Sequence, residues 1–291
     1  MALRTALRSR LARRAPRLDD AAARAVWKRR NKERAYEGTV AAVSPLVERL
    51  RRDGVAITDV ETVFGDDALF RAAADEAQAL YDPPREEHDA AAGSKATFLT
   101  KLATGSYPID HPFVRLALHP NALAVANGYL ELRSTLRALD LWLTKPTEGP
   151  AIQTQLWHRD ADDLMNVKMF VYFTDVTPEA GPLVYAPRTH PLGNRRRLPE
   201  HDEQGRSDDA QLARVAPESD WILCEGRRGS VVFADTCGYH KQQKPDSAER
   251  LLVVSHYVSG TPLVPRSLEL GGVDESSLTD DQYVAVLDRP R

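Results

Sequence analysis

The sequence predicts a mainly β protein in which N-terminal helices support an antiparallel sandwich or barrel. Apolar residues recur at helical spacing before residue 139, whereas short β-rich runs punctuated by Gly and Pro follow it. No helical pattern separates these runs, as the crossovers of a parallel sheet would require. We expect a basic N-terminal arm over 1–34 and one domain over 35–291. Its expected parts are helical support at 35–138, a β core at 139–260 and an acidic tail at 261–291.

The overall composition indicates a soluble globular protein. The 291 residues are 42% hydrophobic and 28% charged, with a net charge of −3, which excludes a largely disordered or collagen-like chain. No run of about eighteen apolar residues occurs, so no transmembrane segment is expected. The two cysteines have no CxxC or zinc-site spacing and indicate a reducing compartment. We therefore expect a cytoplasmic protein.

Charge is distributed unevenly along the chain. Residues 1–34 hold twelve Lys or Arg and three Asp or Glu, a balance of +9, which leaves −12 for the rest. The Arg-rich residues 1–18 resemble a transit peptide, whereas a solvated arm paired with the acidic body explains the same charges. Aromatic residues are not interleaved with the basic ones apart from Trp27 and Tyr36, so nucleic-acid binding is not expected.

The elements before residue 139 follow from periodicity and from helix-ending residues. Val43 and Val47 belong to a series at helical spacing, and Gly54 follows the run Arg51-Arg52-Asp53 that ends it. In order, we expect a helix over 19–52, a strand at 55–58, a helix over 67–81, a long connection at 85–108, and a helix near 112–130 broken at His119-Pro120.

Seven short β-rich runs make up the predicted core. They lie at 139–145, 152–157, 167–174, 183–186, 221–224, 230–234 and 251–258. The polar segment 192–219 predicts an insertion between strands. Together with 85–108 it is a candidate lid, because long loops in compact domains often cover binding sites.

The segment Trp157-His158-Arg159-Asp160 follows an expected strand. Because residues two apart project to the same side of an extended chain, His158 and Asp160 can bind one metal ion together. His240, which follows another β-rich run, is a candidate third ligand. Two histidines and one carboxylate leave positions open, as in the facial triad of non-haem Fe(II) oxygenases. Zinc accepts the same ligands but prefers a closed tetrahedron or a single open site.

Arg250 lies ten residues after His240 and opens the apolar strand at 251–258. A guanidinium directed into a β-sandwich needs an anion, and it matches a carboxylate bidentately. The alternative places Arg250 in solvent, paired with Glu249.

Four further side chains are candidates for the pocket. Lys168, if it faces inward with Tyr172, could bind an anionic co-substrate or substrate; the alternative is an outward lysine. Trp157 could pack beside the metal, and His256 shares the period-two face of Arg250. A core role is the alternative for Trp157 and His256.

These segments resemble the phytanoyl-CoA dioxygenase family of Fe(II)/2-oxoglutarate-dependent oxygenases. The resemblance covers about residues 50–260 and is carried by 157–175, 181–190 and 229–257. It implies a double-stranded β-helix core, the jelly-roll fold of cupin-like proteins. It also implies that His158, Asp160 and His240 bind iron and that Arg250 holds the C5 carboxylate of 2-oxoglutarate.

The sequence departs from the family pattern in two places. Pro187-Arg188-Thr189-His190 replaces the frequent Pro-Gly-Ser-His, and Lys241-Gln242-Gln243 replaces the small residues that usually follow the distal histidine. These changes put local co-substrate contacts in question. Related halogenases carry Gly or Ala at the position of Asp160, so this carboxylate favours oxygen insertion or oxidative ring closure.

The sequence therefore predicts an Fe(II)-dependent enzyme that uses 2-oxoglutarate and O₂, releases succinate and CO₂, and hydroxylates or oxidatively cyclises a small molecule. The Ala- and Arg-rich composition indicates a GC-rich genome, in which such enzymes often act in natural-product biosynthesis. Two alternatives stay open: a jelly-roll binding protein without activity, and a cupin-like metal isomerase or hydrolase. The acidic body favours a neutral or cationic polar substrate over a polyanion, unless the pocket itself is locally basic.

Overall fold

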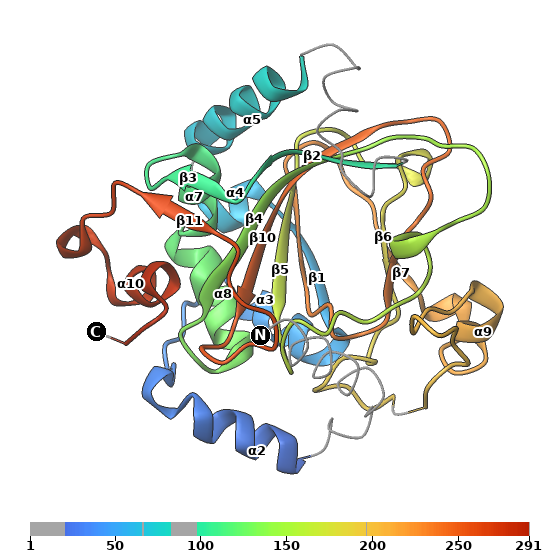
Figure 1. Cartoon of the computed structure of the whole chain (residues 1–291), viewed down its shortest axis with the longest axis horizontal. Coiled ribbons are helices and arrows are strands. Elements are labelled where there is room, and N and C mark those ends of the chain that lie inside the picture. The colour runs from blue at the N-terminus through green and yellow to red at the C-terminus, as the bar shows by residue number, and fades with distance from the viewer. Residues whose placement is uncertain (1–20, 66, 83–97, 196, 291) are drawn as a thin grey trace.

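In the computed structural model the chain forms three layers (Figure 1). Residues 21–65, 67–82, 98–195 and 197–290 are described. A six-stranded antiparallel sheet is covered on one face by helices, and its other face packs against a three-stranded antiparallel sheet. Two facing antiparallel sheets form the predicted jelly-roll core, so the predicted fold class is confirmed.

The sheets draw strands from most of the chain. The six-stranded sheet has the order β1 (Val55–Asp59), β8 (Ser230–Ala234), β5 (Val167–Tyr172), β10 (Arg250–Val258), β4 (Thr135–Thr144), β2 (Leu99–Thr104). The three-stranded sheet has the order β7 (Ile222–Cys224), β6 (Leu183–Tyr185), β9 (His240–Gln242). A short parallel pair joins β3 (Ser106–Pro108) to β11 (Glu269–Gly271).

Strand β10 is buried along its whole length because both faces of the large sheet are covered. Leu251 and Val253 belong to the core beneath the helices, whereas Leu252 and Val254 belong to the core between the sheets. Alternate residues of a strand point to opposite faces, so a strand covered on both sides is apolar without interruption. The face that carries Leu252 and Val254 forms the floor of a cavity between the two sheets.

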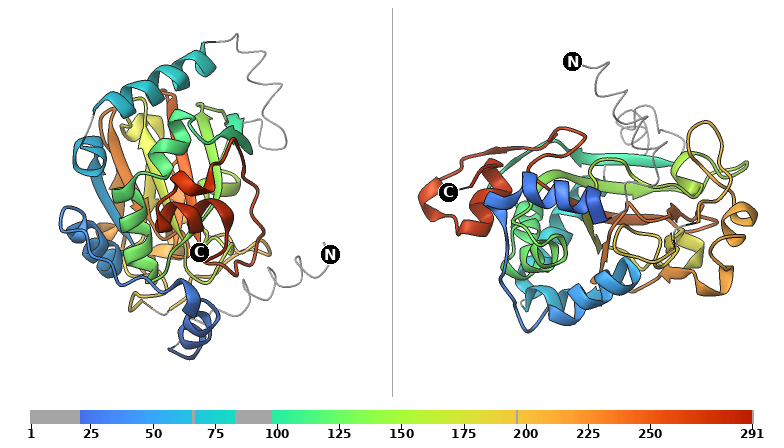
Figure 2. Two further views of the ribbon diagram at one scale, coloured as in Figure 1. Left: turned by 90° about the vertical axis from the view of Figure 1, so that its left-hand side faces the viewer. Right: turned by 90° about the horizontal axis from the view of Figure 1, so that it is seen from below.

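The helices gather on the opposite face of the large sheet (Figure 2). They are α3 (Ser44–Asp53), α4 (Val60–Phe64), α5 (Asp67–Tyr81), α7 (Pro112–Ala117) and α8 (Pro120–Leu130). The break expected at His119-Pro120 is confirmed. His119 Nδ1 accepts a hydrogen bond from the Asn121 N–H at 3.3 Å, and Pro120 occupies the first turn of α8.

Two local predictions are wrong. The segment expected as a strand at 152–157 contains a 3-10 turn, η3 (Gln153–Gln155), because the Gln155 side chain accepts from the Ile152 N–H at 3.0 Å and Gln153 adopts a φ of 51°. The helix expected over 19–52 is divided into three. Its parts are α2 (Ala21–Arg30), η1 (Lys32–Arg34) and α3.

The β core also extends beyond its expected limits. The strand expected at 55–58 is confirmed as β1, and it forms one edge of the large sheet. The other edge strand, β2, also lies in the region expected to be helical support. The connection expected at 85–108 includes β2 and β3, and its residues 85–97 lie outside the described residues. The expected insertion contains α9 (Asp209–Ala213) and η5 (Glu218–Asp220). The remaining short turns are η4 (Pro178–Ala180) and η6 (Glu275–Ser277).

Both ends of the described chain pack on the body. The Arg34 guanidinium is buried and donates to Thr135 Oγ1 at 2.8 Å and to Asp288 Oδ1 at 3.0 Å. Asp288 caps α10 (Asp280–Leu287), so the expected acidic tail contains a docked helix. Residues 1–20 of the expected basic arm lie outside the described residues. None of the helices in the described ranges has the length and apolar character of a membrane span.

Gly54 connects the helical layer to the sandwich. It ends α3 with a φ of 84°, and a Cβ there would lie 2.4 Å from Tyr185 Oη and 2.7 Å from His190 Nδ1. We expect Gly54→Ala to lower the free energy of unfolding by about 3 kcal/mol in urea titrations, because backbone strain and a steric clash add. Gly149→Ala is the control, since Gly149 has a φ of 83° but open space around it. Equal losses in the two variants would contradict the close packing at Gly54.

Candidate metal centre

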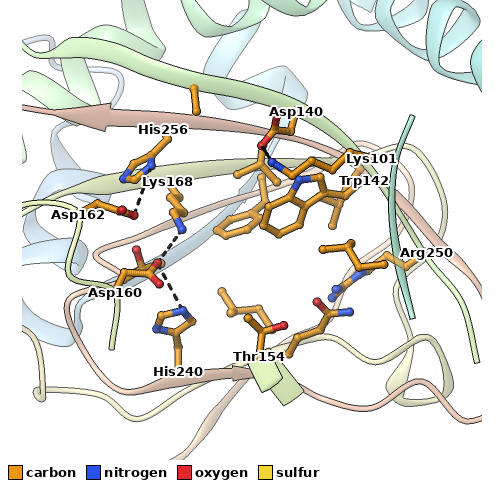
Figure 3. A pocket seen from close by; sticks show the side chains of 18 of the residues that line it. Lys101, Asp140, Trp142, Thr154, Asp160, Asp162, Lys168, His240, Arg250 and His256 are labelled. Carbon is orange, nitrogen blue, oxygen red and sulfur yellow. Dashed lines mark hydrogen bonds and ion pairs between the residues drawn. The ribbon is translucent and has the colours of Figure 1, made fainter. Parts of the chain in front are cut away.

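Three polar side chains converge beside the cavity between the sheets, and Figure 3 shows two of them, Asp160 and His240. One atom each of His158, Asp160 and His240 lies within 4.8 Å of the other two. His158 Nε2 is 3.9 Å from Asp160 Oδ1, and His240 Nε2 is 3.8 Å from Asp160 Oδ2. Within the described ranges, this is the one group of three His, Cys, Asp or Glu residues that could hold a metal ion.

Backbone hydrogen bonds hold these residues together. The His158 N–H donates to the His240 carbonyl at 3.0 Å, and the His240 N–H donates to the His158 carbonyl at 3.0 Å. This isolated antiparallel bridge brings the two imidazole ring centroids to 4.3 Å. The Asp160 N–H donates to the Thr236 carbonyl at 2.8 Å, which fixes the carboxylate on the same side.

Both histidines are prepared to act as ligands through Nε2. His158 Nδ1 lies 2.8 Å from the Leu156 carbonyl, and His240 Nδ1 lies 3.0 Å from the Gly238 carbonyl. A carbonyl can only accept, so the ring proton is on Nδ1 and Nε2 keeps its lone pair. Burial lowers the pKa of His158 to about 3, helped by the neighbouring His240, and burial also lowers the pKa of His240.

Asp160 supplies a negative charge to the group. Burial alone would raise its pKa, but Lys168 and the two imidazoles outweigh burial and hold the pKa well below its ordinary value. Lys168 Nζ donates to Asp160 Oδ2 at 2.6 Å. Two neutral imidazoles and one carboxylate form the donor set of a facial triad, which fits Fe(II) with positions left open.

Arg250 lies in the wall of the same cavity, which has a volume of about 370 Å³. The residue is 3% exposed, and its Nη1 donates to the Gly181 carbonyl at 2.5 Å. Nε has no hydrogen-bond partner, and no carboxylate of the described residues forms an ion pair with the guanidinium. Glu249, the alternative partner, instead accepts from Tyr81 Oη at 2.8 Å. A buried cation in this state needs an anionic ligand.

The structure brings most of the predicted pocket residues together. Tyr172 and His256 line the cavity, and so does Lys168, although its ammonium pairs with Asp160. Trp157 is not among the cavity residues. Its fully buried indole packs against Trp221, with ring centroids 4.6 Å apart, in a separate cluster next to the insertion. The core alternative is therefore the one that describes Trp157.

Sequence reasoning missed the role of Asp209, in the insertion. Its Oδ1 accepts from Trp157 Nε1 at 2.6 Å and from Lys241 Nζ at 2.5 Å. Trp157 precedes His158 and Lys241 follows His240, so one carboxylate oxygen connects the neighbours of both histidines. The backbones of Trp157 and Ser207 also exchange hydrogen bonds of 3.0 and 2.9 Å. These contacts give Lys241, a departure from the family pattern, a structural role.

Comparison with known proteins places the chain in a family. The family model for phytanoyl-CoA dioxygenase (PhyH) matches residues 47–244, so the chain belongs to this family and the resemblance seen in the sequence is confirmed. A search of curated protein sequences gave no match. The donor set and the family both fit the predicted cofactors, Fe(II) and 2-oxoglutarate.

Solved structures of low sequence identity share the fold. One is the epimerase SnoN in complex with Fe³⁺, alpha ketoglutarate and nogalamycin RO, with 21% identity and a TM-score of 0.53 over 80% of this chain and 92% of that one. A second is EctD from S. alaskensis with 2-oxoglutarate and 5-hydroxyectoine, with 20% identity and a TM-score of 0.53 over 81% and 91%. A third is AviO1 from Streptomyces viridochromogenes Tue57, with 18% identity and a TM-score of 0.51 over 79% and 100%.

We expect Asp209→Ala to weaken metal binding, because both ligand-bearing segments lose a shared hydrogen-bond acceptor. Direct hydrogen-bond partners of metal ligands are worth about 10- to 100-fold in affinity, and because Asp209 bonds to the residues next to the ligands, we expect a loss near the lower limit. Titration of the metal-free protein with Co(II) measures it. Asp208→Ala is the matched control, since the side chain of Asp208 accepts from the Gln211 N–H and caps α9. An equal loss of affinity in both variants would show that only helix stability matters.

Asp235 is a buried carboxylate in the loop that leads to His240. Its Oδ2 accepts from Tyr129 Oη at 2.5 Å, and its Oδ1 accepts from the Cys237 N–H at 2.9 Å. Burial raises the pKa of Asp235 to about 6, against the lowering effect of these hydrogen bonds.

This shift predicts a pH-dependent stability. Since the folded pKa exceeds the unfolded value of 3.8, the folded state favours the protonated form, and that stability is lost as the pH rises from about 4 to 6. We expect the wild type to lose about 2–3 kcal/mol relative to Asp235→Asn between pH 4 and pH 7. Urea unfolding of both proteins at each pH gives the difference. A difference that stays constant across this range would contradict the raised pKa.

Proposed function

We propose that this chain is a non-haem Fe(II)- and 2-oxoglutarate-dependent oxygenase that oxidises a small molecule by hydroxylation or oxidative ring closure. The observation that carries the proposal is a His-Asp-His group that shares one cavity with a buried arginine, which has no anionic partner among the described residues. Membership of the phytanoyl-CoA dioxygenase family supports it.

The roles of the residues follow from their chemistry. His158, Asp160 and His240 would hold Fe(II), and Arg250 would bind the C5 carboxylate of 2-oxoglutarate through charge-assisted hydrogen bonds. When bound, iron and 2-oxoglutarate supply the activation of O₂ that oxidises a C–H bond of the substrate. The protein contributes a fixed ligand geometry and a largely dry site.

The walls around Arg250 suit the carbon chain of 2-oxoglutarate. Leu252 lies two residues after Arg250 along β10, and Tyr172 is its partner in the register of β5 and β10. Tyr172 Oη donates to the Cys224 carbonyl at 2.7 Å, so its ring is held in place beside the guanidinium. Leu183 completes an apolar surface at this end of the cavity. Such walls exclude water and strengthen the ion pair that Arg250 would form.

A role in natural-product biosynthesis is part of the proposal, and it rests on the Ala- and Arg-rich composition. The cytoplasmic location and the function of the basic arm stay predictions. Asp160 favours oxidation over halogenation, because its carboxylate occupies the ligand position that related halogenases leave to a halide.

Triad variants test the proposal. With Fe(II), O₂ and a small-molecule library, we expect the wild type to convert 2-oxoglutarate to succinate, and His158→Ala or Asp160→Ala to reduce this conversion at least about 100-fold. His201→Ala is the control, because His201 is an exposed loop histidine. Full turnover in the Asp160→Ala variant would contradict the assignment. Turnover of a compound with Zn(II) and without 2-oxoglutarate would indicate the isomerase or hydrolase alternative.

A further inference from the structure

The cavity wall is more basic than the chain around it. Outside residues 1–34 the chain carries a net charge of −12. The cavity nevertheless contains more cationic side chains than carboxylates among the residues that line it. The cations are Lys101, Arg137, Lys168 and Arg250, and the carboxylates are Asp140, Asp160 and Asp162.

This inference rests on the proposed function. With iron and 2-oxoglutarate bound, the charges in the cavity sum to one uncompensated positive charge. Fe(II), Asp160, the two carboxylates of 2-oxoglutarate and Arg250 together carry no net charge. Lys101 pairs with Asp140 at 2.7 Å, and Arg137 lies 3.7 Å from Asp162. Lys168 lies 2.6 Å from Asp160, but that carboxylate is already counted against iron, so one positive charge remains at Lys168, whose side chain is 14% exposed. A charge removed from water in this way is stabilised by a counter-ion.

Lys168 has two donor neighbours, and we name Lys168, Arg137 and His256 the basic corner. Lys168 and His256 are opposite each other in the register of β5 and β10, and Ala138, next to Arg137, faces His256 from β4. At the other end of the cavity floor lies Arg250, six residues from His256 along β10. Figure 3 shows Arg250 and the Lys168–His256 pair on opposite sides of the cavity.

His256 presents a hydrogen-bond donor that has no partner. Its Nδ1 lies 3.3 Å from Arg137 Nη1, and because a guanidinium only donates, Nδ1 accepts and the ring proton is on Nε2. His256 is 3% exposed, and its Nε2 is buried without a hydrogen-bond partner among the described residues. A buried N–H left unpaired is costly, so this site favours a ligand with an acceptor.

Arg137 also has capacity for an acceptor. Its Nη2 is 3.7 Å from Asp162 Oδ1, which is within ion-pair range but too far for a hydrogen bond. Asp162 Oδ2 lies 3.9 Å from His256 Nδ1 and is the carboxylate that faces the corner. The floor between the basic corner and Arg250 is apolar or aromatic, with Phe170, Val254 and Trp142 along it.

We propose that the substrate is a carboxylic acid whose single negative charge binds at the basic corner, with an apolar or aromatic framework along the cavity floor. One carboxylate neutralises the remaining cation and accepts from Lys168, Arg137 and His256. The acidic body alone favoured a neutral or cationic substrate, unless the pocket was locally basic. Because the pocket is locally basic, the preference is reversed in favour of an anionic substrate.

Binding of matched acids and amides tests the proposal. Wild-type protein is loaded anaerobically with Fe(II) and saturating 2-oxoglutarate, which occupies Arg250. It is then titrated with ten arylalkanoic acids and their amides, beginning with phenylacetate and phenylacetamide. We expect acids to bind at least about tenfold more tightly than their amides, as loss of a charge-assisted hydrogen bond implies. The absence of an acid preference in every pair overturns the proposal.

Two variants locate the carboxylate. Arg137→Gln should weaken acid binding by about 10- to 100-fold and amide binding much less, because an amide carbonyl loses only a neutral acceptor contact. Lys101→Met, which removes a lining cation that already has its own carboxylate, should keep the acid preference. A preference kept in Arg137→Gln contradicts the assignment to this corner. The visible absorption of the Fe(II)–2-oxoglutarate complex is measured before each titration and separates the proposed function from the substrate assignment. If this absorption is absent, the proposed function is wrong. If it is present, the titration tests the substrate assignment alone.

Discussion

The candidate site depends on the reciprocal pair of backbone hydrogen bonds between His158 and His240. Both residues belong to segments with little regular structure, a loop after η3 and the three-residue strand β9. Their pairing sets the spacing of the imidazoles, and the carbonyls of Leu156 and Gly238 set which nitrogen faces Asp160. Since each Nδ1–H is bound to the backbone of the same segment, the ligand orientation is built before any metal arrives.

Strand β10 then relates this centre to the rest of the cavity. Because alternate residues share a face, Arg250, Leu252, Val254 and His256 all lie on the cavity floor, while Leu251 and Val253 pack beneath the helices. One strand therefore carries the buried arginine at one end and the histidine of the basic corner at the other. The large sheet sets the distance between these two positions, and His240 on β9 of the small sheet lies across from them, with His158 bridged to it.

Much of this was predictable from local pattern. Periodicity predicted α5 at its observed limits and the apolar strands of the large sheet, and the HxD motif with a later histidine predicted the triad. The prediction of a strand at 152–157 was wrong because the Gln155 side chain accepts a hydrogen bond from the Ile152 N–H and stabilises a turn. β9 is short and polar, so no pattern marks it. The role of Asp209 depends on contacts across 52 and 32 residues, and the charge of the cavity depends on which side chains face inward, which a sum along the sequence does not show.

The roles of the triad and of Arg250 are tested most directly by an anaerobic titration of the Fe(II)-loaded protein with 2-oxoglutarate, followed by visible absorption, in the wild type and in Arg250→Met. We expect a weak charge-transfer band in the wild type. In Arg250→Met we expect the same band only at concentrations at least about tenfold higher, because a charge-assisted contact is lost while the iron ligands remain. A wild type without the band, or two titrations with the same midpoint, would contradict these roles.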